Sequence, residues 1–148
     1  MKIGVSSKLM QGLTLEEILR SASSVGFQGV EVWMHQAEDS GMSAGDIKNL
    51  AAHLGLLLRV HADTRDVNLT SSNKAIREAS VNQVLSAIDF SSALDSPTIT
   101  VHPGRMTGGK ELITAERLWE LQIEAFTALA RQAEKKTFCA LTNGYAGT

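Results

Sequence analysis

Five short apolar segments alternate with longer stretches of helical periodicity along this chain. The segments are rich in Val, Ile and Leu and occupy residues 2–6, 29–33, 57–61, 98–102 and 137–142. Strands that alternate with helices are typical of repeated βα units, whose strands run parallel in one sheet. The sequence therefore predicts an α/β fold with five parallel strands and four helices, in a single domain over residues 1–148.

The predicted helices carry start and stop signals. Their expected N-terminal caps are Thr14, Ser43, Asn73 and Thr114. Glu17 stands three residues after the first cap, which is the spacing of a capping box. Gly26 and Gly55 are expected to end the first two helices, because glycine readily takes the left-handed conformation found there. In the last helix, the helical spacing predicts a buried stripe of Trp119, Ile123, Phe126 and Ala130.

The two faces of the predicted sheet differ in polarity, because successive side chains of a strand point to opposite sides. The apolar set is Ile3, Val5, Val30, Val32, Leu58, Val60, Ile99 and Val101, with Phe138 and either Leu141 or Cys139 from the last strand. The opposite set is polar or small: Gly4, Ser6, Glu31, Trp33, Arg59, His61, Thr98, Thr100, His102, Ala140 and Thr142. A sheet covered on both faces is apolar on both, so this pattern predicts a singly wound sheet, as in part of a barrel.

Polar side chains gather where the predicted strands end, which is where α/β proteins place their sites. His61 and His102 end two of these strands and are either a metal or substrate pair or hydrogen-bonded structural residues. Glu31 is a candidate general base or metal contact, or the salt-bridge partner of Arg59 on the next strand. Trp33 is a candidate substrate contact or a core residue.

The remaining polar residues carry weaker signals. Residues 104–111 (GRMTGGKE) approach the spacing of a phosphate-binding loop, but the position that needs Ser or Thr is a glutamate. Arg105 and Lys110 are still candidate contacts to an anionic substrate. His35 and His53 are expected to lie in a loop and on a helix surface. Cys139, on a predicted buried strand, is expected to be an inert apolar residue.

Composition and charge limit the classes of function. Fourteen Lys and Arg residues against sixteen Asp and Glu residues give a net charge of -2, which argues against a nucleic-acid partner bound mainly through phosphate contacts. A single cysteine excludes an internal disulfide and any cysteine-rich zinc site. The sequence shows neither a signal peptide nor a membrane span, so we expect a cytoplasmic protein without a membrane partner.

Three segments of the chain are similar to a known superfamily. Residues 26–33 (GFQGVEVW), 59–94 (RVHADTRDVNLT and the helix that follows) and 98–105 (TITVHPGR) resemble the xylose isomerase-like TIM-barrel superfamily. That superfamily contains sugar phosphate isomerases and epimerases and the AP endonuclease family 2 enzymes. The resemblance implies a partial (β/α)8 TIM barrel, truncated after its fifth strand.

The resemblance also implies a divalent metal, one of Mn, Mg, Co or Zn. His61 and His102 stand where the endonuclease branch has zinc-ligating histidines, whereas in the sugar branch these positions line the substrate pocket. The fifth strand of the sugar branch ends in an ALENxxG-like segment whose Glu binds the metal. Residues 140–144 read ALTNG here, so Thr142 replaces that glutamate.

These observations lead to one main hypothesis and two alternatives. The main one is a sugar (phosphate) isomerase/epimerase-like protein that moves a proton beside the carbonyl of a small polyhydroxy substrate with the help of a divalent metal. Its candidate catalytic residues are Glu31, His61 and His102, and its candidate substrate contacts are Trp33, Arg105 and Lys110. The alternatives are an AP endonuclease-like zinc-dependent nuclease and a half-barrel without activity that associates with itself.

A homodimer is the expected assembly. An open half-barrel leaves Trp33 and the edges of the first and fifth strands in water. A twofold interface is self-complementary, so a second copy is the simplest cover for that surface.

Overall fold

The computed structural model of the protein describes residues 2–107, 113–136 and 139–142. Its elements along the chain are β1 (Gly4–Ser6), the 3-10 turn η1 (Ser7–Met10), α1 (Leu15–Val25), β2 (Gly29–Trp33), α2 (Met34–Ser40), α3 (Ala44–His53), β3 (Leu57–His61), α4 (Lys74–Ala93), β4 (Thr98–Val101), α5 (Ala115–Lys135) and β5 (Cys139–Thr142). The five predicted strands and four predicted helices are present. Short helix α2 and turn η1, which follow β2 and β1, were not predicted from the sequence.

All five strands are parallel and lie in sequence order, β1-β2-β3-β4-β5. The sheet is open, with β1 and β5 at its edges. Trp33 on β2 is the register partner of His61 on β3, and His61 in turn neighbours Thr100 on β4. The register of β5, which the sequence left undecided, places Thr142 beside Val101.

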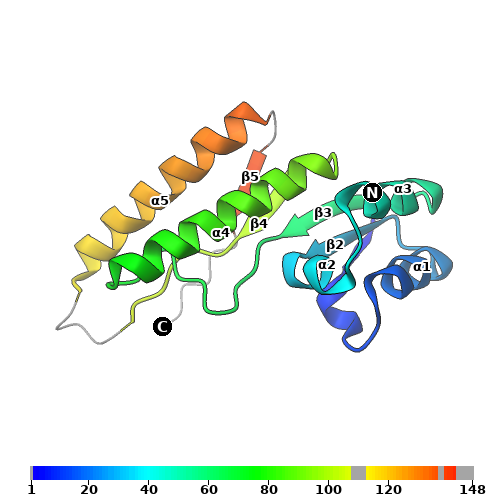
Figure 1. Cartoon of the computed structure of the whole chain (residues 1–148), viewed down its shortest axis with the longest axis horizontal. Helices are drawn as coiled ribbons and strands as arrows, with labels where there is room; N and C mark the ends of the chain where they lie inside the picture. Colours follow the sequence, from blue (N-terminus) through cyan, green and yellow to red (C-terminus); the bar gives the residue numbers. More distant parts are fainter. Residues whose placement is uncertain (1, 108–112, 137–138, 143–148) are drawn as a thin grey trace.

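The helices cover one face of the sheet and leave the other polar, as the alternation of side chains predicts. Helix α1 contacts β2, α3 contacts β3, α4 contacts β3 and β4, and α5 contacts β5. Figure 1 shows α4 and α5 lying side by side over the half of the sheet that contains β4 and β5. The strands contribute Val30, Val32, Leu58, Val60, Ile99 and Val101 to the core beneath these helices. Ile3 is an exception to the predicted apolar set, because it precedes β1 at the edge of the sheet and is 56% exposed.

The predicted caps explain where the helices begin and end. Thr14 and Glu17 form the capping box, and Ser43 forms a second one with Asp46. The side chains of Asn73 and Thr114 accept hydrogen bonds from backbone amides in the first turns of α4 and α5. Gly26 ends α1 with a φ of 93°, which a residue with a β-carbon rarely adopts.

The predicted buried stripe of α5 is wrong. Trp119 and Ile123 are 62% and 50% exposed, Ala130 is exposed, and only Phe126 packs against the core. The buried residues of the helix are instead Leu121, Ala125, Leu129 and Ala133. Both stripes have helical spacing, and the helix buries the stripe that faces α4 and the sheet.

None of the helices in the described part of the chain combines the length and apolar character needed to cross a lipid bilayer.

Candidate active site

The carboxyl ends of β2, β3 and β4 bring the predicted site residues together. His61 ends β3, Trp33 ends β2, and His102 follows β4 directly. The ring centroids of His61 and His102 lie 5.0 Å apart. The imidazole of His61 also stacks on the indole of Trp33, with 3.7 Å between centroids and 9° between planes. The two histidines and the tryptophan predicted from the sequence therefore form one cluster at the sheet edge where parallel α/β folds carry their sites.

The surroundings of His61 fix its protonation state. The side chain is buried, and its Nδ1 lies 2.7 Å from the carbonyl oxygen of Ala62. Burial lowers the pKa of His61 below its usual value, and the nearby His102 and Lys8 lower the pKa further. The Ala62 carbonyl and the Glu31 carboxylate oppose that shift without reversing it. A neutral imidazole that donates its Nδ1 proton to a carbonyl keeps a lone pair on Nε2, which can accept a proton or bind a metal.

The carboxylate of Glu31 is not used in a salt bridge with Arg59. The two residues are register partners on β2 and β3, but the guanidinium of Arg59 donates a hydrogen bond to the hydroxyl of Thr98. Glu31 accepts a hydrogen bond of 2.9 Å from the hydroxyl of Thr100 on β4. The part of the chain that the structure describes contains no ion pair of Glu31. The carboxylate of Glu31 is thus held by Thr100 on the polar face of the sheet.

Trp33 is enclosed by polar neighbours and is only 7% exposed. Its indole N–H donates a 2.9 Å hydrogen bond to the hydroxyl of Ser6. The ammonium of Lys8 lies 4.1 Å from the ring centroid, and the ring of His35 meets the indole edge-on at 5.7 Å. Little of the indole is left for a sugar to stack on, so its visible role is to hold His61 and Lys8.

His35 and Asp63 also lie in this region, but the sequence pattern did not identify either of them as a site residue. His35 lies in the first turn of α2, which was expected to be a loop, and its buried Nδ1 is 3.8 Å from a carboxylate oxygen of Asp63. Burial by itself would raise the pKa of Asp63, but hydrogen bonds from Arg65 and from the backbone N–H of Thr64 lower it overall. The only signal in the sequence was the position of Asp63, two residues after His61.

The loops after β3 and β4 are joined to each other by Asn68. Its side-chain amide donates to the carbonyl oxygen of Arg105 at 3.0 Å and accepts from the Arg105 backbone N–H at 2.9 Å. Thr70 also donates to the Arg105 carbonyl. A β-carbon on Gly104 would lie 2.0 Å from the hydroxyl of Thr70, so this close approach requires glycine. The backbone of Arg105 is thereby fixed near the cluster, whereas Lys110, the other predicted anion contact, lies outside the described residues.

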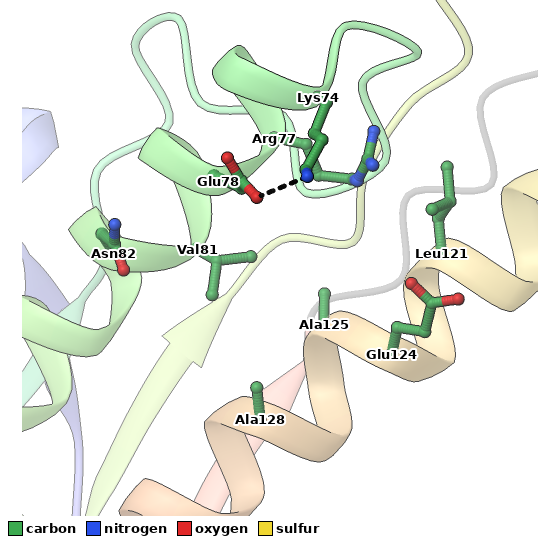
Figure 2. Close-up of a pocket in the computed structure, with 9 residues that line it drawn as sticks. All are labelled: Lys74, Arg77, Glu78, Val81, Asn82, Leu121, Glu124, Ala125 and Ala128. Carbon is green, nitrogen blue, oxygen red and sulfur yellow. Dashed lines mark ion pairs between the residues drawn. The ribbon is translucent and has the colours of Figure 1, made fainter.

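A separate groove of about 550 Å³ lies between α4 and α5. Figure 2 shows Val81 of α4 opposite Leu121, Ala125 and Ala128 of α5, with the ion pair of Lys74 and Glu78 at one end. None of the histidines lines this groove. Its charged residues each have a partner: Lys74 pairs with Glu78, Glu124 pairs with Arg117, and Arg77 donates to the carbonyl oxygen of Ser71. The strand-end cluster is therefore the better candidate for chemistry.

Comparisons with known proteins identify the family of this chain. A family model described as xylose isomerase-like TIM barrel matches residues 19–141. The chain belongs to the xylose isomerase-like TIM barrel family. No curated protein matches it.

Solved structures share the fold of this xylose isomerase-like chain at low sequence identity. One is the crystal structure of a D-tagatose 3-epimerase-like protein, with a TM-score of 0.82, 24% identity, and coverage of 99% of this chain and 55% of that one. A second is D-psicose 3-epimerase from Clostridium cellulolyticum H10 with D-tagatose, with a TM-score of 0.77, 18% identity, and coverage of 95% and 51%. A third is the IOLI protein with a bound zinc atom, with a TM-score of 0.80, 12% identity, and coverage of 96% and 51%. The present chain spans about half the length of each.

The zinc atom of that third structure raises the question of whether this family member has the ligands for a metal. His61 and His102 offer two imidazoles, whereas catalytic zinc sites use three protein ligands. Among the side chains that the structure describes, no group of three His, Cys, Asp or Glu residues is arranged to hold a metal ion. The described residues therefore do not make a complete metal site.

Proposed function

We propose that this chain binds a small polyhydroxy ketone or aldehyde at the strand-end cluster and moves a proton on the carbon beside its carbonyl, as a sugar isomerase or epimerase does. The observation that supports this best is the 5.0 Å approach of buried His61 to the ring of His102, on the same polar face of the sheet as the carboxylate of Glu31. Two groups of different basicity beside each other are what acid–base chemistry on one carbon requires.

In the proposed reaction, Glu31 removes the proton from the carbon next to the carbonyl. The electron pair of the broken C–H bond moves to the carbonyl oxygen and gives an enediolate. His102, which is partly exposed, is the candidate donor to that oxygen, and His61 Nε2 is a candidate proton carrier. Return of a proton to the other face of the same carbon, with His102 taking back the proton of the oxygen, yields the epimer. Return of a proton to the former carbonyl carbon, with loss of the hydroxyl proton on the first carbon, yields the isomer. Neither outcome consumes an oxidant or a reductant.

A divalent metal would polarise the carbonyl oxygen of such a substrate when bound. Among the described residues, His61 and His102 are the ones whose ring nitrogens would bind such a metal. The remaining ligands would have to come from residues that the structure does not describe. Arg105 and Lys110 stay proposed contacts to an anionic group of the substrate, whereas the enclosed Trp33 is proposed to position His61 and not to contact the substrate.

The experiment that tests this proposal is solvent isotope exchange. The protein is incubated in D2O with D-tagatose, D-fructose and their 6-phosphates, with and without each of Mn, Mg, Co and Zn, and deuterium at the carbons beside the carbonyl is followed by NMR. Exchange detects proton removal even where the epimer is not released. The double variant His61→Ala/His102→Ala and Glu31→Gln should lower exchange by about 10²–10⁴-fold, which is the usual contribution of acid–base groups.

The control variants are His53→Ala and Glu120→Gln, whose side chains are exposed on α3 and α5. They should exchange at the wild-type rate. Exchange that survives in the double histidine variant would exclude this site. Absence of exchange with every sugar and metal would contradict the proposed function and favour a half-barrel without activity.

A further inference from the structure

The strand-end cluster contains a cation that the proposed chemistry does not use. Lys8 lies in η1, the turn that leaves the carboxyl end of β1. Its ammonium nitrogen is 4.1 Å from the centroid of Trp33, the ring on which His61 stacks. One side chain, that of Trp33, thus separates Lys8 from His61, the proposed proton carrier.

The backbone that carries Lys8 is held in place by its neighbour Ser7. Ser7 is fully buried, and its hydroxyl accepts a 3.0 Å hydrogen bond from the backbone N–H of Trp33. The side chain of Gln36 adds two further bonds, one to the Ser7 hydroxyl and one to the Ser7 carbonyl. These bonds connect η1 to the junction of β2 and α2, so the approach of Lys8 to the cluster is set by the fold.

The other charged side chains of this region each have a hydrogen-bond partner. Asp63 pairs with Arg65, Arg59 bonds to Thr98, and Glu31 accepts from Thr100. Within the described ranges, Lys8 takes part in no ion pair, and its ammonium group lies over the indole ring of Trp33. An ammonium held over an aromatic ring without a carboxylate remains able to bind an anion, and charge-assisted hydrogen bonds to phosphate or carboxylate are the strongest it can make.

We propose that Lys8 is a further substrate-binding residue of this site and that it selects sugars carrying an anionic group, a phosphate or a carboxylate, over neutral sugars. This inference rests on the proposed function, because it assigns the substrate class of the same site. Asn68 fixes the backbone of Arg105, three residues beyond His102, so a second cationic residue follows a strand at the same edge of the sheet. Binding of the anion draws the ammonium away from Trp33, so the indole reports it.

Direct binding measurements test the inference without any need for turnover. Trp33 and Trp119 are the two tryptophans of the chain, so Trp119→Phe leaves Trp33 as the single fluorophore. In that background, D-tagatose, D-tagatose 6-phosphate and D-galacturonate are titrated at low ionic strength, and the emission of Trp33 and the heat of binding are recorded. Lys8→Met keeps the aliphatic stem beside the indole and removes the charge, and Lys8→Arg keeps the charge. Lys2→Met, an exposed lysine at the other end of β1, is the matched control.

The expected result is that the 6-phosphate or the uronate binds at least tenfold more tightly than D-tagatose and changes the emission of Trp33. Lys8→Met should lower the affinity for that anionic sugar at least tenfold and leave the affinity for D-tagatose within twofold. In this variant, the affinities for the two sugars should depend on salt to the same extent. Lys8→Arg and Lys2→Met should bind as the parent does. Whichever anionic sugar loses more affinity in Lys8→Met identifies phosphate or carboxylate as the group bound.

Two failures are distinguishable. If D-tagatose and its 6-phosphate bind the parent equally well and Lys8→Met changes neither, the role of Lys8 is wrong while sugar binding stands. If the parent binds none of the three sugars, the proposed function and the inference that rests on it both fall.

Discussion

The imidazole of His61 lies flat on the indole of Trp33, although the two residues are on different strands and 28 positions apart in the chain. Their pairing in the β2–β3 register creates this contact, because register partners in parallel strands point to the same face. The stack buries His61 and keeps it neutral, while the carbonyl of Ala62 fixes the Nδ1 proton. One strand register therefore sets the protonation state of a candidate catalytic group.

The stability of the protein should fall as the pH drops below the ordinary histidine pKa of about 6.5. Burial lowers the pKa of His61 in the folded state, so the unfolded chain takes up a proton there before the folded chain does. The unfolded state then binds more protons, and the free energy of unfolding decreases until the folded pKa is passed. Urea denaturation at a series of pH values from about 7.5 to 5.5 measures this slope, and His61→Gln should flatten it.

The matched control for that measurement is His53→Gln, because His53 is exposed on α3. This variant should keep the wild-type slope. A steeper loss of stability on acidification in His61→Gln than in the wild type would mean that His61 is protonated in the folded state.

Gly104→Ala should destabilise the protein by about 1–3 kcal/mol, the usual cost of overpacking. The added β-carbon would lie 2.0 Å from the hydroxyl of Thr70 and 2.5 Å from its backbone nitrogen, so the two loops must separate. Thermal unfolding measures the loss. Gly45→Ala is the control: its β-carbon has only a 3.6 Å contact inside α3, and alanine favours a helix, so stability should stay equal or rise. Equal stability of the two variants would contradict the close approach of the loops.

Asp63→Asn should lower stability by about 1.5–3 kcal/mol at neutral pH, because the carboxylate accepts charge-assisted bonds from Arg65 as well as two backbone amides. The pKa of Asp63 is lowered in the folded state, so its contribution is present above the unfolded pKa of about 3.9 and is lost as the pH falls through the folded pKa. Chemical denaturation at neutral and acidic pH should show that the free energies of unfolding of Asp63→Asn and of the wild type become equal in acid. Glu134→Gln, an exposed change on α5, should match the wild type at both pH values.

The sheet and the gathering of polar side chains at its strand ends could be predicted because they depend on local patterns. Alternation along each strand separated the core side chains from the polar face, and the strand ends identified His61 and His102. The contacts of Glu31 could not be predicted, because they depend on which neighbour crosses the sheet: Arg59 was a candidate partner, but Thr100, one strand further, is the one that bonds to it.

Contacts between loops, and the choice between two possible buried faces of a helix, could not be predicted from local patterns. His35 and Asp63 meet only once α2 and the β3 loop have folded, so neither stood out. In α5, both the Trp119–Ile123 stripe and the Leu121–Ala125 stripe have helical spacing. The position of α4 decides between them, and that information is tertiary.

We propose that a second copy covers the polar face of the open sheet. Both edge strands, β1 and β5, and the exposed residue Arg59 lie on that surface, which a twofold partner could shield. Light scattering coupled to size exclusion should then give a mass near twice 15.9 kDa. Thr98→Arg, which adds bulk and charge to this face, should shift the mass toward that of one chain, whereas Ile123→Glu on the outer side of α5 should not. A dimer broken by Ile123→Glu and retained by Thr98→Arg would place the interface on α5, and a monomeric wild type would contradict the assembly altogether.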